Sequence, residues 1–516
     1  MKKLRGLLRI IFGRTTFVVL FLLIQVWILF CGFNWLREYM VYVFGGSTIL
    51  SAIVLIYIIS ADESSSIKLS WVVPILVIPV FGTLFYLFVK LQPGSRLINR
   101  RLQTLGREIE PFLKQDEQVM DRFNSISSSQ GNLARYMNHF GGFPVYEHTN
   151  AKYFPLGDDM FVEMMEQLKK AEHFIFMEFF IVERGYMWNS ILEILTEKVK
   201  QGVEVRFMYD GMCCLVLLPY SYPKVLEEKG IKCKMFSPVK PALSSYQNNR
   251  DHRKICVIDG HTAFTGGVNL ADEYINRKVR FGHWKDTAIM LKGDAAASFT
   301  MMFLQMWGVT EKQKEDYSRY LLPADYEFPP DLNMEGFVMP YGDSPLDREN
   351  VGEQVYLDIL GHAKKYVHIM TPYLILDDEL ASALRYSAKR GLETIIIMPH
   401  IPDKIYAYLL ARSYYSELLE AGVKIFEYTP GFVHAKVFTS DDEKAVVGTI
   451  NLDFRSLYLH FECAAYLYKN AAVREVEQDF QDTLLKCQEI TLENCGKYPF
   501  YKRFAGRALR LFAPLM

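Results

Sequence analysis

The sequence lacks an excess of charge of either sign. Its 58 lysine and arginine residues are balanced by 59 aspartate and glutamate residues, which gives a formal net charge of −1 at pH 7. A chain without an overall positive field does not draw in a polyanion such as DNA. The composition therefore counts against a nuclease, and we expect no nucleic-acid partner.

Cysteines are also scarce and irregularly placed. Only eight occur in 516 residues, among them the adjacent Cys213 and Cys214, and there is no pair of CxxC motifs. A disulfide framework or a structural zinc site requires cysteines at regular spacings. We therefore expect free thiols with ordinary packing roles.

Apolar residues, in contrast, make up half of the chain, and they are concentrated near the N-terminus. Residues 17–33, 40–60 and 69–89 form three apolar runs, each close to the roughly 20 residues that cross a bilayer. No small-residue cleavage site follows the first run, which argues against a cleaved signal peptide. We predict that residues 1–95 form a membrane anchor with two to three transmembrane segments.

The orientation of this anchor is not fixed by the sequence. Basic residues precede the first run and also follow the third, and both clusters favour the cytoplasmic side. Three full crossings cannot satisfy both. Either one run is re-entrant, with the third, which contains Pro74 and Pro79, as the candidate, or the rule is broken here. The membrane face that holds the active site is left open.

The rest of the chain contains a long internal repeat. After a linker and amphipathic helix at residues 96–138, three segments of the first half recur in the same order in the second half. Residues 164–182 match 355–376, residues 194–212 match 383–401, and residues 225–236 match 417–428. Each copy alternates amphipathic helices with short apolar strands, which predicts an α/β fold with helices packed on a sheet. Gly202, Gly230, Gly391 and Gly422 follow helical segments, where we expect left-handed caps.

Both copies end in the same polar motif, H-x-K-x4-D-x6-G-[GT]-x-N. The first contains His252, Lys254, Asp259, Gly266, Gly267 and Asn269, and the second contains His434, Lys436, Asp441, Gly448, Thr449 and Asn451. Residues two apart in a strand face the same side, so each histidine projects together with its lysine. If the halves pair about a pseudo-two-fold axis, two imidazoles, two ammoniums and two amides surround one anionic group. A phosphodiester fits that arrangement.

This motif pair suggests a division of labour. One histidine attacks phosphorus to form a phosphohistidine, and the other protonates the leaving alcohol. Lys254, Lys436, Asn269 and Asn451 stabilise the phosphoryl oxygens. The lysines supply the positive charge that magnesium provides elsewhere, so we expect no metal and no cofactor. Asp259 and Asp441 belong either to the catalytic set or to structural turns.

The remaining histidines have no repeated partners. We interpret six of them, His261, His283, His362, His368, His400 and His460, as surface or core residues.

The twin motifs resemble those of the phospholipase D superfamily, and nearly the whole chain is similar to the bacterial cardiolipin synthases. Similar blocks lie at residues 141–159, 177–195, 451–462 and 509–516. The resemblance implies two duplicated phospholipase D-like α/β domains, residues 139–332 and 333–516, each a mixed sheet flanked by helices. They share one active site and follow the transmembrane helices.

The resemblance also implies an activity. It is that of a multi-pass bacterial cell-membrane transphosphatidylase that condenses two phosphatidylglycerol molecules into cardiolipin and glycerol. His252 is then the nucleophile and His434 the acid and base. Glu178 and Glu462, on or near the strands that flank the motifs, could orient the histidines. The alternative is a phospholipase D-type phosphodiesterase that hydrolyses phospholipids or transfers the phosphatidyl group to another alcohol. The oligomeric state is left open.

Overall fold

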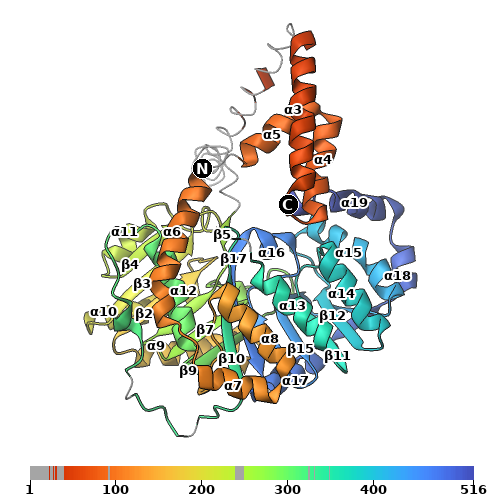
Figure 1. Cartoon of the computed structure of the whole chain (residues 1–516). Coiled ribbons are helices and arrows are strands. Elements are labelled where there is room, and N and C mark those ends of the chain that lie inside the picture. The colour runs from red at the N-terminus through yellow and green to blue at the C-terminus, as the bar shows by residue number, and fades with distance from the viewer. Residues whose placement is uncertain are drawn as a thin grey trace, which may run out of the picture.

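The computed structural model describes residues 40–90, 93–238, 249–323, 326–330, 332–347 and 349–515, together with Leu23, Trp27, Phe30 and Cys31. A two-sheet body carries a projecting group of N-terminal helices (Figure 1).

The two halves of the body contain sheets with the same strand order. The first sheet runs β1 (Thr149–Phe154), β9 (Ala288–Gly293), β7 (Thr262–Gly266), β6 (Ile255–Ile258), β2 (Phe174–Phe179), β3 (Glu204–Asp210) and β4 (Lys232–Phe236). The second runs β10 (Phe337–Asp343), β17 (His460–Tyr468), β16 (Lys444–Gly448), β15 (Val437–Ser440), β11 (Tyr366–Met370), β12 (Glu393–Pro399) and β13 (Lys424–Tyr428), with β18 (Cys487–Ile490) added at its edge. Each sheet mixes parallel and antiparallel pairs. The predicted α/β duplication is therefore confirmed.

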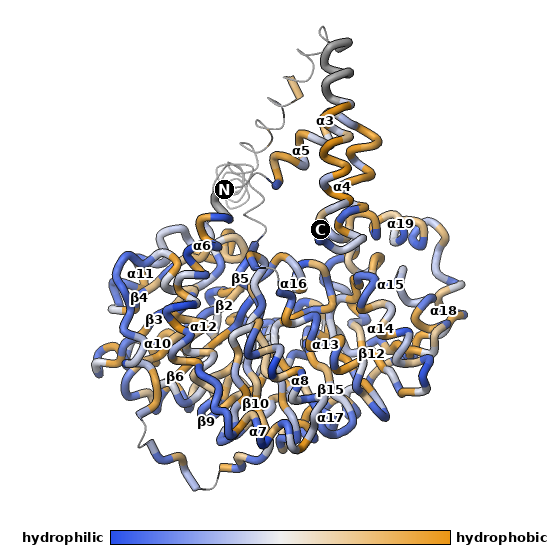
Figure 2. Tube along the Cα trace, viewed as in Figure 1, coloured by the Kyte–Doolittle hydropathy of each residue, from blue (hydrophilic) through white to orange (hydrophobic). Residues whose placement is uncertain are grey.

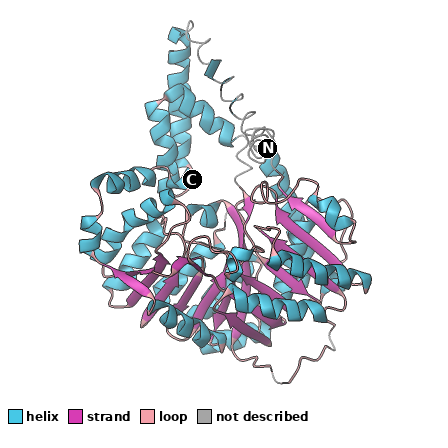
Figure 3. Cartoon of the chain, turned by 180° about the vertical axis from the view of Figure 1, so that it is seen from behind, coloured by secondary structure: helices cyan, strands magenta, loops and turns pink. Residues whose placement is uncertain are grey.

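Helices cover the sheets in layers (Figure 3). In the first half they are α9 (Gly157–Lys170), α10 (Tyr186–Lys200), α11 (Tyr222–Glu227) and α12 (Ala296–Gly308). In the second half they are α13 (Val351–His362), α14 (Asp378–Lys389), α15 (Ile405–Glu420), α16 (Phe454–Tyr458) and α17 (Ala472–Leu484). All four predicted glycine caps have positive φ angles, from 81° to 96°, the region that favours glycine.

The two halves share one hydrophobic core. It contains Phe176 and Val257 from the first sheet and Val437 and Val447 from the second. Two equivalent helices complete it, because α12 contacts both β6 and β10, and α17 contacts both β1 and β15. Burial of this shared apolar surface holds the halves in one arrangement.

The segment between the N-terminal apolar runs and the repeat is helical and partly buried. It contains α6 (Pro93–Ile109), α7 (Glu117–Ile126) and α8 (Ser128–Tyr136). Phe123 of α7 is fully buried in the core of the second half, 4.6 Å from Phe337 between ring centroids. Residues 96–138 are thus more than a linker, because they add to that core.

The N-terminal apolar runs differ in what the structure describes. The run at residues 17–33 lies outside the described residues, apart from four isolated positions. The second run forms α3 (Met40–Ser60), and the third is broken into α4 (Ser65–Val77) and α5 (Pro79–Lys90). A Cβ atom on Gly82 would lie 2.6 Å from the carbonyl oxygen of Pro74, so α5 turns back closely on α4. None of the described helices combines the length and the apolar character that a bilayer crossing requires.

The C-terminal segment returns to the foot of these helices. After α18 (Leu492–Lys497), α19 (Phe500–Arg510) packs on α15, and the short 3₁₀ turn η7 (Ala513–Leu515) contacts α4. The hydroxyl of Ser70 in α4 donates to the carbonyl of Leu511 at 2.7 Å. Figure 2 shows the largely hydrophobic colouring of α3–α5 next to the mixed colouring of the body.

Candidate active site

His252 is held against the second half of the chain. It directly follows β5 (Arg250–Asp251), which pairs in parallel with the start of β17, and its backbone N–H donates to the carbonyl of Phe461 at 2.9 Å. On the same strand, both carboxylate oxygens of Glu462 lie 2.9 Å from Nδ1 of His252. The hydroxyl of Thr449 also donates to this carboxylate. These contacts fix the ring and leave Nε2 for a substrate.

His434 is held in the equivalent way against the first half of the chain. It follows β14 (Gly431–Val433), which pairs in parallel with β8 (His283–Lys285). Its backbone N–H donates to the carbonyl of Lys285 at 2.7 Å. The carboxylate of Asp286, the next residue, lies 2.6 Å from Nδ1 of His434. Each imidazole is therefore supported by a carboxylate from the opposite half, and neither half can build the site alone.

The charged groups of the second motif affect the pKa of the histidine in the first motif. Burial lowers the pKa of His252 well below its ordinary value, and the positive charges of Lys254, Lys436 and the neighbouring histidines, His434 included, lower it further. Burial likewise lowers the pKa of His434 to about 4, helped by Lys436 and opposed by Asp286. Both imidazoles are therefore neutral near pH 7. A neutral imidazole is the form that can attack phosphorus.

The two supporting carboxylates differ in charge. Burial raises the pKa of Glu462 to about 8, so its contact with neutral His252 is a hydrogen bond and not an ion pair, and attack by Nε2 requires that Nδ1 carries the ring proton. Burial also acts to raise the pKa of Asp286, but its interactions with His434 and Lys436 and the hydrogen bond from the Thr287 amide outweigh burial and hold that pKa below its usual value. Asp286 therefore remains ionised beside His434, where it favours protonation of that ring.

The two lysines lie beside their histidines. Nζ of Lys254 donates to the carbonyl of His252 at 2.6 Å, and Nζ of Lys436 lies 2.9 Å from Nδ1 of His434. Burial lowers the pKa of Lys254 to about 8 and that of Lys436 to about 7. A bound phosphate anion would favour the charged form of both lysines.

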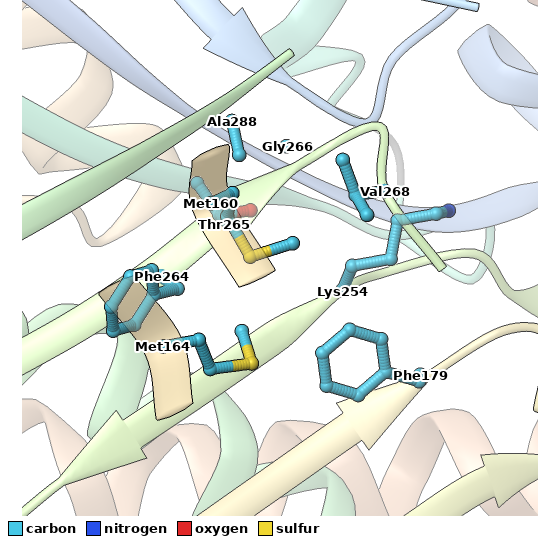
Figure 4. A pocket seen from close by; sticks show the side chains of 9 residues that line it. All are labelled: Met160, Met164, Phe179, Lys254, Phe264, Thr265, Gly266, Val268 and Ala288. Atoms are coloured by element: carbon cyan, nitrogen blue, oxygen red, sulfur yellow. The ribbon is translucent and has the colours of Figure 1, made fainter. Parts of the chain in front are cut away.

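The stem of Lys254 borders a small, mainly apolar cavity of about 10 Å³. Figure 4 shows Met160, Met164, Phe179 and Phe264 around this cavity, and the amino group of Lys254 points away from them. The apolar lining supports the methylene stem and leaves the charged end for the site.

The two motif asparagines already have protein partners. Asn269 accepts a hydrogen bond from the amide of Ile181 and donates to the hydroxyl of Tyr274, both at 2.9 Å. Asn451 donates to the hydroxyl of Ser456 at 3.0 Å. Each amide nitrogen carries a second hydrogen, so their predicted contact with phosphate stays a prediction.

The motif aspartates bind backbone amides, which favours the structural-turn role over the catalytic role that the sequence left open. The carboxylate of Asp259 accepts hydrogen bonds from the backbone amides of residues 172–174 at 2.7–2.8 Å. Asp441 binds the amides of residues 364–366 in the same way, at 2.8–3.2 Å. Both residues have positive φ angles, 50° for Asp259 and 59° for Asp441. They shape the turn after the motif strand and fasten it to the start of the neighbouring strand.

Glu178 does not orient a histidine, so this part of the prediction is wrong. Its carboxylate accepts a hydrogen bond from Nε of Arg253 at 2.7 Å. Arg253 lies between His252 and Lys254 and points the other way, as alternation along an extended segment requires. The prediction that Glu462 contacts a histidine agrees with the structure.

Sequence reasoning missed two residues of this site. Asp286 stands 17 positions after Asn269, whereas Glu462 stands 11 after Asn451, so a comparison at fixed spacing does not reveal the pair. Alignment of the strand registers would have found it, because Gly266 pairs with Ala288 and Gly448 pairs with Ala464, and each acid stands two residues before that partner. His460, treated above as an ordinary histidine, lies with its ring centroid 5.6 Å from that of His252.

Two groups of side chains among the described residues are close enough together to hold a metal ion. In the first, ligand atoms of His252, His460 and Glu462 lie within 4.8 Å of one another, but Glu462 is already engaged by His252. The second contains Glu353, Asp377 and Glu379. The hydroxyl of Tyr458 binds the first two of these carboxylates. We assign a metal to neither group.

Comparison with known proteins places the chain in a family. A family model described as "Cardiolipin synthase, PLD-like domain" matches residues 164–307 and 356–484, and a second, "Phospholipase_D-nuclease N-terminal", matches residues 49–90. A cardiolipin synthase of Alkalihalophilus pseudofirmus is 33% identical over 94% of this chain and 95% of its own length. An uncharacterized protein of Streptococcus mutans is 49% identical over 89% of this chain and 99% of its own length.

A solved structure agrees at the level of the fold. The crystal structure of phosphatidylserine synthase from Haemophilus influenzae superposes with a TM-score of 0.55, at 13% identity, over 75% of this chain and all of that chain. The first family model covers more than half of the chain, in two repeats that coincide with the two halves described above. The chain therefore belongs to the cardiolipin synthase family, whose domains are phospholipase D-like.

Proposed function

We propose that this enzyme condenses two phosphatidylglycerol molecules into cardiolipin and glycerol through a phosphohistidine intermediate. The observation that carries the proposal is the pair of imidazoles, His252 and His434, each held at Nδ1 by a carboxylate from the opposite half. Such a pair supplies a nucleophile and an acid–base group for one phosphorus atom. The names of the relatives support a phosphatidyl transfer.

In the first half-reaction, Nε2 of His252 attacks the phosphorus of one phosphatidylglycerol. The bond from phosphorus to the headgroup oxygen breaks, and glycerol leaves with a proton from His434. His434 must be protonated for this step. The negative phosphate favours that form, because an opposite charge nearby raises the pKa of an imidazole, and Asp286 acts in the same direction.

In the second half-reaction, a hydroxyl of another phosphatidylglycerol gives its proton to His434 and attacks the same phosphorus. The phosphorus–nitrogen bond breaks, and His252 leaves as a neutral ring. Lys254 and Lys436 stabilise the charge on the phosphoryl oxygens throughout. The loss of one such donor typically lowers a rate by about 10²–10³-fold.

Attachment to a membrane favours transfer over hydrolysis, because it raises the local concentration of lipid acceptors. We propose that α3–α5 provide this attachment. Apolar side chains of these helices project outward with 56–72% exposure: Ile49, Ile53, Ile56, Ile59, Leu69, Leu76 and Val77. Such a surface marks a membrane or protein contact. The break between α4 and α5 supports a re-entrant third run, which would let both basic clusters lie on one side.

The assay that tests this function uses the purified full-length enzyme in detergent with phosphatidylglycerol labelled in its headgroup as the only lipid. We expect cardiolipin and free glycerol in equal amounts, and we expect added glycerol to drive the reaction backwards. Phosphatidic acid as the sole lipid product would instead establish the phospholipase D-type alternative. Addition of phosphatidylethanolamine or another alcohol would then show whether the acceptor is restricted to phosphatidylglycerol.

The two carboxylates that cross between the halves should each matter for the rate. Glu462→Gln and Asp286→Asn keep the size of the side chain but remove the carboxylate that holds the imidazole. We expect each change to lower kcat by about 10- to 100-fold, the usual cost of losing a carboxylate behind a functional histidine. Initial rates of cardiolipin formation at saturating phosphatidylglycerol measure this.

A matched control is Glu183→Gln, because among the described residues the carboxylate of Glu183 pairs only with a surface lysine, Lys278. This variant should keep the wild-type rate. If Glu462→Gln and Asp286→Asn also keep it, the carboxylates do not act through the histidines.

A further inference from the structure

The helix α19 exposes a row of aromatic side chains, which is unusual for a helix whose outer face contacts water. Phe500 and Phe504, one turn apart, are 74% and 66% exposed, and Tyr501 beside them is 68% exposed. Arg503 and Arg507, also one turn apart, are exposed along one flank of this stripe. Neither arginine has an ion-pair partner among the residues that the structure describes. Surface helices of soluble proteins normally turn charged residues outward and apolar residues inward.

The inward face of α19 packs against α15 of the body. Gly506 packs so closely on α15 that a Cβ atom would lie 2.4 Å from the carbonyl oxygen of Leu409. The guanidinium of Arg510 lies 3.7 Å above the ring of Tyr414 and donates to the hydroxyl of Ser413 at 2.8 Å. The aromatic stripe is thus not a core face that has failed to pack. It is a second apolar face, held outward by a firmly docked helix.

The position of α19 connects it with both the anchor and the active site. The turn η7, which follows α19, contacts α4 of the anchor and also α16. α16 leads directly into β17, the strand that carries Glu462. Figure 1 shows α19 at the end of the body from which α3 and α4 project, on the side where β5 and α16 lie. α19 therefore lies beside the foot of the apolar helices, to which η7 joins it.

We propose that α19 lies in the headgroup region of an anionic bilayer, with Phe500, Tyr501 and Phe504 inserted and Arg503 and Arg507 contacting lipid phosphates. Aromatic residues flanked by arginines are the pattern of helices that bind in the membrane interface, and basic residues near the surface favour anionic lipids. α19 would then fix the height and tilt of the active site over the membrane. The choice of anionic lipid rests on the proposed function, since phosphatidylglycerol carries that charge.

Tryptophan quenching tests this directly in the full-length enzyme reconstituted into vesicles with brominated acyl chains. The two variants are Phe504→Trp and Val162→Trp. Val162 is a matched control because it is 65% exposed and lies on α9, far from α19 (Figure 1). We expect the added emission of the first variant to be quenched several-fold more than that of the second. Equal quenching would overturn the proposal. It is the result expected if a protein partner or a second copy, and not lipid, covered α19.

A second comparison tests whether Arg503 and Arg507 bind anionic lipid. In Phe504→Trp we expect stronger quenching in vesicles rich in phosphatidylglycerol than in phosphatidylcholine vesicles, and we expect salt to weaken the difference. Adding Arg503→Gln and Arg507→Gln should abolish this difference, whereas Lys169→Gln and Lys200→Gln, on α9 and α10, should leave it. A difference that survives loss of the arginines would overturn the anionic contact. The readout needs no turnover, so a quenched α19 in an enzyme that fails to make cardiolipin would contradict the proposed function alone.

Discussion

The His252→Ala variant should lose cardiolipin synthesis almost completely, with a rate lowered by about 10⁶-fold, the order found when a covalent nucleophile is removed. His434→Ala should lower the rate by about 10²–10⁴-fold, the usual contribution of a general acid or base. The reason for the difference is that His252 forms the bond to phosphorus, whereas His434 only moves protons. Rates of cardiolipin formation from labelled phosphatidylglycerol measure both losses.

A substrate with a good leaving group separates the two roles more sharply. Nitrophenol leaves phosphorus without needing a proton, so a phosphatidyl nitrophenol ester bypasses the acid. With this substrate, His434→Ala should give a burst of nitrophenol equal to the enzyme concentration and a lipid bound to the protein through an acid-labile bond. His252→Ala should give neither. The opposite result would show that His434 is the nucleophile.

Controls must show that a lower rate comes from loss of the catalytic side chain and not from misfolding. His139→Ala removes an exposed histidine whose ring hydrogen-bonds only to the carbonyl of Arg135 among the described residues, and it should keep the wild-type rate. His252→Ala and His434→Ala should retain the wild-type elution volume and thermal midpoint in detergent. If they do not, the variants His252→Gln and His434→Gln, which keep a polar side chain, provide the comparison.

The sequence predicts the repeat and the paired motif well because both are local patterns. Helix and strand periodicity, glycine caps and the H-x-K spacing depend on residues within a few positions of one another. Matching periodicity in two halves then implies matching sheets, which share strand order from β1 to β4 and from β10 to β13. The pairing of His252 with Lys254 on one face follows from the same alternation.

The contacts between the halves could not be predicted in this way. Asp286 lies 148 positions from His434, and Glu462 lies 210 positions from His252. Their meeting depends on two exchanged strand pairs, β5 with β17 and β14 with β8, and each involves only two or three residues. Strands this short carry no periodic signal. The sequence leaves the role of Asp259 and Asp441 open for a related reason, because a fixed position in a repeated motif does not separate a catalytic role from a turn role.

The most instructive error concerns Glu178, because its true partner predicts a large effect on stability. Glu178 and Asp251 are buried, with exposed fractions of 0% and 1%, and Nε of Arg253 lies 2.7 Å from the first and 3.4 Å from the second. Arg253→Ala would leave the carboxyl pair of Glu178 and Asp251 buried without its cation. We expect a loss of about 3–5 kcal/mol in the free energy of unfolding, the usual result of removing one partner of a buried ion pair. Denaturant titration in detergent measures it.

The second half of the chain offers the control, because the repeat replaces this ion network with apolar residues. The strand registers align Glu178 with Met370, and the positions that flank His252 and His434 align Asp251 with Val433 and Arg253 with Ala435. All three of these apolar residues are fully buried. We therefore expect the triple variant Glu178→Met, Asp251→Val and Arg253→Ala to recover most of the stability that Arg253→Ala loses. Apolar replacement of a whole buried ion network is often neutral or stabilising, since no charge is left without a partner. A triple variant as unstable as the single one would mean that Arg253 stabilises the fold through contacts other than these two carboxylates.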